Sequence, residues 1–191
     1  MRLRRPPGGR IRYSNFGVAV LGNALAARAG RSYESLLADR VTGPLGLQDT
    51  VVTLRPDQES RRAHGHKGRR RPTPDWSMPS LPGMGALHST AADLARFVRA
   101  QVRPDDTPLG DAIRMTQEPR VGSGRMRSGL GWMITPVGTG PRRVHWHNGG
   151  TGGARSFAGF VRGSTVAVAL LSNSRRGPEP LAFDVLNQLA G

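Results

Sequence analysis

The hydrophobic pattern of this 191-residue chain changes its period about two thirds of the way along. Up to about residue 128, apolar residues at helical spacing predict helices over 16–29, 33–40, 89–102 and 109–115. From residue 129, short apolar segments separated by Gly-rich turns predict strands over 130–135, 144–147, 156–161 and 165–172, before a last helix over 181–189. This order predicts an α+β fold in which helices pack on an antiparallel sheet.

Local signals mark the ends of these elements. Asn15 is placed to cap the first helix, and Gly30 is placed to end it in the left-handed conformation. Thr90 and Asp93 have capping-box-like spacing at the start of the helix over 89–102. Between about residues 55 and 84 the chain is rich in Pro, Gly, Arg and His and has no apolar periodicity, so we expect a surface excursion there that could act as a lid.

A formal net charge of +15 would ordinarily indicate an anionic partner such as nucleic acid. However, Lys67 is the only lysine among 28 basic residues, a skew typical of GC-rich codon usage in a bacterial genome. The basic clusters are short and scattered, and they lack interleaved aromatic residues. A basic nucleic-acid-binding module therefore stays as the disfavoured alternative, and nucleic-acid binding that weakens steeply with salt would support it.

The chain has no cysteine, no signal-peptide-like apolar core and no run of about 18 apolar residues. We therefore expect no membrane association and, for the chain as written, a cytoplasmic location. An exported full-length parent stays open, because many exported bacterial enzymes also lack cysteine. We expect neither a cofactor nor a bound metal.

Two short motifs flank the body of the domain. Tyr13-Ser14-Asn15 immediately precedes the first helix, and His147-Asn148-Gly149 lies at the end of one predicted strand. Each motif alone is a weak signal, with a packed tyrosine and a helix cap as the simpler interpretation of the first. The pair becomes specific through the segments around it, which run in order as YSNFGVAVLG at 13–22, SYE at 32–34, PLGLQDT at 44–50, GMGALHSTAADLARF at 83–97, GLGW at 129–132 and WHNGG at 146–150.

In order and spacing these segments resemble the β-lactamase-related serine hydrolases, a family of class C β-lactamases, D-alanyl-D-alanine carboxypeptidases, D-aminopeptidases and esterases. The resemblance implies a β-lactamase/transpeptidase-like fold and an acyl-transfer site for small-molecule or peptide amide and ester substrates. Such a site combines Ser-x-x-Lys on a helix, Tyr-x-Asn on a loop and Lys/His-x-Gly on a strand. Tyr13 would be the proton shuttle and Asn15 would hold the substrate amide or the serine–lysine geometry.

His147 would take the basic position of the third element, where histidine is more similar to the esterase and aminopeptidase branches than to true β-lactamases. Gly149 would have to be small so that the acyl group can approach the strand. The backbone N–H of Gly150 would supply half of an oxyanion hole, the other half coming from the serine.

The chain departs from the family pattern at the nucleophile. Residue 64, three positions before the only lysine, is His64, so no Ser-x-x-Lys exists in these 191 residues. We therefore expect a truncated domain, with residues 1–12 as a basic remnant and 13–191 as a partial domain whose helical part ends near 128 and whose sheet part covers 129–191. It would lack its N-terminal strands and nucleophile helix and be inactive as given. The alternative is a non-catalytic binding remnant or half of a split protein, which makes a missing N-terminal half a candidate partner. The exposed edge of an incomplete sheet predicts association or low solubility.

The histidines allow one further hypothesis. His64 and His66, like His145 and His147, are spaced by two, and a strand places such a pair on one face. No carboxylate lies near either pair in sequence, so we expect no metal site. The simpler expectation is solvent exposure for His64 and His66, and for His145 a strand residue pointing the same way as His147.

Overall fold

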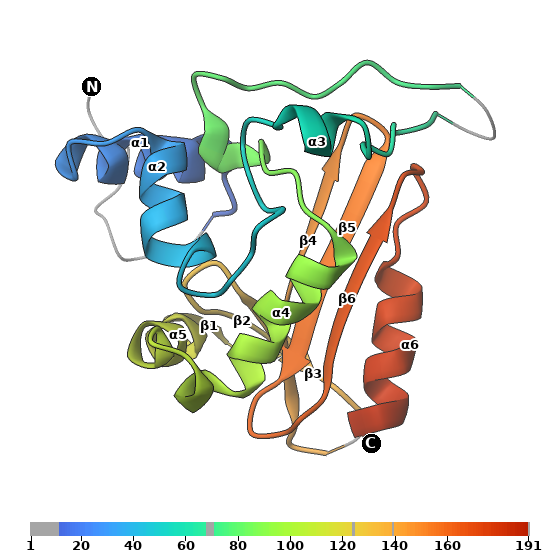
Figure 1. The fold of residues 1–191 in the computed structure, drawn as a ribbon. Coiled ribbons are helices and arrows are strands. Elements are labelled where there is room, and N and C mark those ends of the chain that lie inside the picture. The colour runs from blue at the N-terminus through green and yellow to red at the C-terminus, as the bar shows by residue number, and fades with distance from the viewer. Residues whose placement is uncertain (1–11, 68–70, 124, 139, 191) are drawn as a thin grey trace.

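The computed structural model of the protein describes residues 12–67, 71–123, 125–138 and 140–190. Its centre is an antiparallel sheet whose strands lie side by side in chain order (Figure 1). The strands are β1 (Val121–Ser123), β2 (Met126–Ser128), β3 (Met133–Pro136), β4 (Arg143–Thr151), β5 (Ala154–Val161) and β6 (Ala167–Ser172). The predicted α+β fold is confirmed, although the sheet starts with two short strands before residue 129.

Helices cover both faces of the sheet (Figure 1). They are α1 (Asn15–Arg28), α2 (Tyr33–Leu37), α3 (Pro56–Glu59), α4 (Ala91–Val102), α5 (Gly110–Gln117) and α6 (Glu179–Ala190), with a π turn η1 (Ala38–Thr42) and 3₁₀ turns η2 (Pro82–Met84) and η3 (Pro104–Asp106). Helix α4 packs on β5 and β6 from one side, and α6 packs on the same two strands from the other. None of the described helices has the length and hydropathy needed to cross a bilayer.

The alternation of side chains along β4 and β5 builds a core on each face of the sheet. Under α6, the ring of Trp146 stacks on Phe157 at 5.9 Å and meets Phe183 edge-on at 5.2 Å. On the opposite face, His145 stacks on Phe160, and Phe160 is fully buried. Even-numbered residues of β4 therefore point toward α6. Odd-numbered residues, including His147, point toward α4 and α1.

The first helix begins one residue earlier than expected. Ser14, with an extended backbone, is the N-cap, and its hydroxyl accepts the backbone N–H of Gly17 at 3.0 Å. Asn15 is therefore the first helical residue, and the expectation that it caps the helix is wrong. The smaller Ser14 hydroxyl already satisfies a free N–H of the first turn. Gly30 has φ of +63°, as predicted for a residue that ends a helix.

Thr90 caps helix α4, and its hydroxyl accepts the N–H of Asp93 at 3.2 Å. Asp93 is only 2% exposed, and its carboxylate does not return to the cap as a capping box would require. Instead it accepts the backbone N–H of Asp49 at 2.8 Å and the hydroxyl of Thr50 at 3.0 Å. The carboxylate thereby ties α4 to the segment that follows η1.

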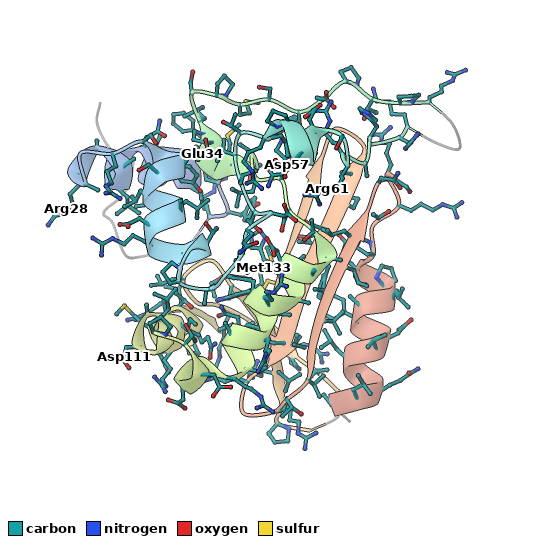
Figure 2. All side chains as sticks on the ribbon, in the orientation of Figure 1. Arg28, Glu34, Asp57, Arg61, Asp111 and Met133 are labelled. Atoms are coloured by element: carbon teal, nitrogen blue, oxygen red, sulfur yellow. The ribbon has the colours of Figure 1, made fainter. Side chains whose placement is uncertain are left out.

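The described parts of the excursion, residues 55–67 and 71–84, cross the top of the sheet (Figure 1). His66 donates its backbone N–H to the carbonyl of Asn173 at 3.0 Å, and the hydroxyl of Thr73 bonds the carbonyls of Gly65 and Gly152. Figure 2 shows Asp57 and Arg61 together on its first turn, where Arg61 also pairs with Asp49 at 2.9 Å. The excursion is thus fixed to the β4–β5 turn and to the end of β6 by hydrogen bonds that its polar composition did not predict.

Candidate active site

The phenol of Tyr13 and the imidazole of His147 lie side by side. Their ring centroids are 6.1 Å apart and the rings are inclined by 31°. Tyr13 lies in the loop just before α1 and is 64% exposed, whereas His147 is half-buried on β4. Residues 134 positions apart in sequence therefore meet at one place, between the start of a helix and the middle of a strand.

Strand β4 has an open edge that begins at His147. On one side β4 pairs with β5 along its whole length, from Val144 to Thr151. On the other side β3 pairs with residues 143–146 only. Within the described ranges, residues 147–151 consequently have no strand on that side, so backbone groups of this segment are free to bind an extended ligand.

Gly149 and Gly150 are constrained by their partners on β5. A Cβ on Gly149 would lie 2.7 Å from the hydroxyl of Ser156, and one on Gly150 would collide with the guanidinium of Arg155. Because paired residues share a face, Gly149 and Ser156 lie on the side of His147, and Gly150 and Arg155 lie on the α6 side. Cross-strand packing is therefore a reason for a small residue at Gly149, whereas the end of the flexible Arg155 side chain can move away from a side chain at Gly150.

Asn148, between these residues, points to the opposite face of the sheet. Its amide donates to the carboxylate of Glu179 at 2.6 Å, at the first residue of α6. This hydrogen bond, with smaller help from the backbone N–H of Glu179 and from Arg155, holds the pKa of Glu179 below its usual range. The contact anchors β4 to α6 and so helps fix the strand that carries His147.

Asn15 is exposed in the first turn of α1, two residues after Tyr13. The turn η2 packs against the same helix, since a Cβ on Gly83 would lie 3.3 Å from Ala19. The next glycine, Gly85, faces the methyl group of Thr151 and the indole of Trp76. These contacts connect the helix that carries Asn15 to the far end of the open edge of β4.

Sequence reasoning missed Ser156 and Trp76. Ser156 lies beside Gly149 on the face of His147, and strand pairing, which the sequence does not specify, brings it there. Trp76 is 40% exposed and packs against Gly152 and Gly85 at the end of β4. For Trp76, the signal in the sequence was a large aromatic residue within a Pro-rich stretch.

The other histidines have separate places. His145 is 3% exposed, and its Nε2 lies 3.0 Å from the carbonyl of Gln117; burial lowers its pKa, partly offset by this hydrogen bond. His64 is exposed and lies 4.0 Å from Asp75, a carboxylate that sequence proximity did not indicate. His66 is half-buried, which corrects the expectation of simple solvent exposure. No cluster of three or more His, Asp or Glu side chains suited to a metal occurs in the part of the chain that the structure describes.

Two cavities lie away from Tyr13 and His147. One, of about 440 Å³, lies between α4 and the start of β6, and the other, of about 360 Å³, lies between α2, η1 and residues 46–55. Neither is lined by a residue of the Tyr-x-Asn or His-x-Gly motifs. The candidate site is therefore an exposed strand edge beside a helix start.

Comparison with known proteins agrees with this geometry. The β-lactamase family model matches residues 1–190, and the chain belongs to this family. Penicillin-binding protein 4 of Amycolatopsis lactamdurans is 31% identical over 206 aligned residues, which cover 97% of this chain and 54% of that protein. The D-alanyl-D-alanine-carboxypeptidase/endopeptidase AmpH of Escherichia coli K12 is 32% identical over 104 residues, 54% of this chain and 26% of that protein.

Solved structures of the same family share the fold. A class C β-lactamase superposes on all of this chain with a TM-score of 0.88 at 20% identity. The D-alanine carboxypeptidase AmpC of Burkholderia cenocepacia covers 98% of the chain with a TM-score of 0.86 at 21% identity. This chain spans 61% and 64% of those two chains, so the matched relatives contain a substantial segment beyond it.

Proposed function

We propose that this chain supplies two of the three elements of a serine acyl-transfer site, with Tyr13 and Asn15 in one and His147 and Gly149 in the other. The observation that carries the proposal is the 6.1 Å approach of the Tyr13 and His147 rings next to an open strand edge. The substrate would be an amide or ester of the kind that the names of the relatives indicate, a β-lactam or a D-alanyl peptide.

Tyr13, His147 and the backbone N–H of Gly150 would each have a different role in acyl transfer. An alcohol nucleophile needs a base, and a phenolate at Tyr13 would serve if neighbouring cations stabilised it. His147 is placed to add positive charge beside the phenol when it is protonated. An acyl group lying along residues 147–151 would direct its carbonyl oxygen toward backbone donors such as the N–H of Gly150.

The nucleophile itself must come from elsewhere. These 191 residues contain no Ser-x-x-Lys, so the proposed site is incomplete without a segment that brings a serine and a cation to Tyr13. We therefore propose that the isolated chain is inactive. It would act either as part of a larger enzyme or as a binding remnant.

The first test uses the chain alone. Purified protein should not be labelled by fluorescent penicillin or a fluorophosphonate, and it should not hydrolyse p-nitrophenyl esters above background. Covalent labelling mapped by mass spectrometry to any serine of this chain would contradict the proposed inactivity.

The second test adds the missing element. The chain is produced together with a separate polypeptide from the part of the Amycolatopsis protein that lies outside its match, and penicillin acylation is followed. Tyr13→Phe should slow acylation by roughly 10²–10⁴-fold, the usual contribution of a general acid or base. Tyr33→Phe is the matched control, because Tyr33 packs on Gly22 away from the site, and equal effects of the two changes would refute the role of Tyr13.

A further inference from the structure

Two groups of basic residues that are far apart in the sequence lie next to each other at one end of the sheet. The backbone of His66 forms a parallel bridge with Ser174, and its N–H donates to the carbonyl of Asn173 at 3.0 Å. The imidazole Nδ1 of His66 lies 3.2 Å from the same carbonyl, which is 107 positions away in sequence. The lysine that follows His66 and the two arginines that follow Ser174 are therefore neighbours.

Four cations are exposed on these two loops. The N–H of Lys67 donates to the carbonyl of Arg71 at 2.8 Å, which keeps these two residues of the excursion together. Arg175 and Arg176 lie between β6 and α6, and the N–H of Arg176 donates to the hydroxyl of Ser174 at 3.1 Å. All four basic side chains are exposed. The backbone contacts thus fix the positions of the four residues, and the charges stay at the surface.

A fifth cation, Arg155, connects this surface with the open edge of β4. Arg155 pairs with Gly150 of β4 on one side and with Ser172 of β6 on the other. Its side chain lies across Gly150, because a Cβ at that glycine would be 2.9 Å from the guanidinium carbon. Gly150 is exposed and belongs to the segment 147–151, which no described strand pairs on its outer side. The guanidinium of Arg155 is therefore next to this edge, on the α6 face.

The basic surface, as we define it, is the set of cations at this end of the sheet: Lys67, Arg71, Arg155, Arg175 and Arg176. Among the described residues, none of the five takes part in an ion pair. Two nearby carboxylates have other partners, since Asp75 pairs with Arg62 at 2.9 Å and Glu179 accepts the amide of Asn148 at 2.6 Å. The hydrogen bond from Asn148 is the largest cause of the lowered pKa of Glu179, and Arg155 adds a smaller electrostatic effect. The basic surface therefore keeps its charge available to a ligand.

We propose that the basic surface binds acidic side chains of an extended polypeptide ligand whose backbone lies along residues 147–151. The open edge of β4 offers backbone groups to such a ligand, and the guanidinium of Arg155 lies where this edge passes Gly150. Acidic side chains beyond the paired segment would then meet the cations of the two loops. The inference rests on the proposed function in placing the ligand at this edge, and it adds the chemical class of the ligand, an acidic peptide.

A polypeptide fits this surface better than a nucleic acid does. Proteins that bind single-stranded nucleic acids combine a basic groove with aromatic side chains on which the bases stack. The segments 64–67, 71–74 and 173–177, which carry the cations of the two loops, contain no Phe, Tyr or Trp. An open strand edge, by contrast, recognises another peptide backbone through main-chain hydrogen bonds. An acidic peptide therefore uses both the edge and the charge.

Peptide binding to the isolated chain tests the inference. The probes are fluorescently labelled peptides with a short uncharged segment and a run of glutamates, placed at either end so that both directions of pairing are sampled. Matched peptides carry glutamine in place of glutamate. At low salt, an acidic peptide should bind at least about tenfold more tightly than its glutamine counterpart in fluorescence anisotropy, and this ratio should fall as salt screens the charges. The amide chemical shifts of residues 150–153 should change on binding.

Charge removal then locates the contact. Arg175→Gln combined with Arg176→Gln should weaken binding of the acidic peptide by roughly three- to tenfold and leave binding of the glutamine peptide unchanged, and so should Arg155→Gln alone. The control, Arg28→Gln combined with Arg125→Gln, removes the same net charge as the first pair from exposed positions elsewhere; Figure 2 shows Arg28 at the outer end of α1. The control should leave both affinities unchanged. Circular dichroism checks that each variant is folded.

Three results would overturn the inference: equal affinity for the acidic and glutamine peptides, an equal loss of affinity in the two double variants, or tighter binding of double-stranded DNA than of the acidic peptides. The last result would make the basic surface a nucleic-acid site. Binding of acidic peptides by a chain that shows no penicillin acylation in the second test above would support this surface and count against the proposed function. Acylation without any preference for acidic peptides would do the reverse, so the two proposals can fail separately.

Discussion

Replacing Asp93 by alanine should destabilise the domain more than any comparable change of a surface carboxylate. The side chain is 2% exposed and accepts three hydrogen bonds, from the backbone N–H of Asp49, the hydroxyl of Thr50 and the guanidinium of Arg96. These bonds join the first turn of α4 to the loop after η1. Their loss would leave the part-buried N–H of Asp49 without its acceptor, whereas the hydroxyl of Thr50 also lies 2.9 Å from the hydroxyl of Ser89.

The magnitude follows from the kind of bond that is lost. A hydrogen bond to a charged acceptor contributes about 1.5–3 kcal/mol, and two such bonds come from Asp49 and Thr50. Arg96 is 58% exposed, so its ion pair adds less than about 1 kcal/mol. Asp93→Ala should therefore lower the free energy of unfolding by about 3–5 kcal/mol, a third or more of the stability of a typical domain.

Urea denaturation followed by circular dichroism measures this change. The matched control is Asp111→Ala, which also removes a first-turn aspartate and an ion pair three residues along the helix, with Arg114. The Asp111 side chain is fully exposed (Figure 2), so the control should unfold at the same urea concentration as wild type. If the two variants unfold at the same urea concentration, Asp93 does not tie α4 to its neighbour as described.

Three further predictions concern the sheet and the excursion. Burial lowers the pKa of His145, so the folded protein binds fewer protons than the unfolded chain and stability falls as pH drops below about 6.5. Between pH 7 and 5, the free energy of unfolding measured with urea should change less with pH in His145→Gln than in wild type. Parallel pH dependences of the two proteins would contradict this prediction. Thr73→Val removes the one hydroxyl donor that the carbonyls of Gly65 and Gly152 share, and it should speed hydrogen exchange in the excursion by roughly tenfold without changing β5. Gly149→Val places a branched side chain against Ser156 and should lower stability by about 1–3 kcal/mol, whereas Gly140→Ala, which meets open space, should not; equal melting temperatures would refute the packing argument.

Most elements could be predicted because local chemistry decides them. The helix ends at Gly30 and Thr90 depend on a left-handed glycine and a hydroxyl cap, which act within a few residues. Strands β5 and β6 and helix α6 have strong apolar patterns, and the structure places each within two residues of its expected bounds. The strand order makes β1 and β6 the two edges of the sheet.

Elements that depend on distant partners were missed or shortened. Strand β4 continues through Gly149 and Gly150 to Thr151, although glycine disfavours strands, because β5 pairs with it throughout. Strands β1 and β2 are three residues each and are specified by pairing with one another and with β3. Nothing in the sequence around His66 and Thr73 indicates that these residues hold the excursion against the sheet.

The residues of the candidate site likewise divide into those that the sequence indicated and those that depend on distant partners. The motifs containing Tyr13 and His147 were found from sequence because they resemble a family pattern, and the structure brings their rings together. Ser156 and Trp76 could not be found, because strand register and loop path place them near Gly149 and Thr151. The N-cap was assigned to Asn15 rather than Ser14, since both residues are good caps and the choice depends on backbone geometry.

The juxtaposition of Tyr13 and His147 can be measured directly by NMR on the isolated chain. With two tyrosines and five histidines in the sequence, aromatic signals can be assigned by single replacements such as Tyr13→Phe. Rings whose centroids are 6.1 Å apart should give a nuclear Overhauser cross-peak between Tyr13 and His147, and none between Tyr33 and His147. A His147 ring with no cross-peak to Tyr13, and with unchanged chemical shifts in Tyr13→Leu, would show that the two motifs do not form one site.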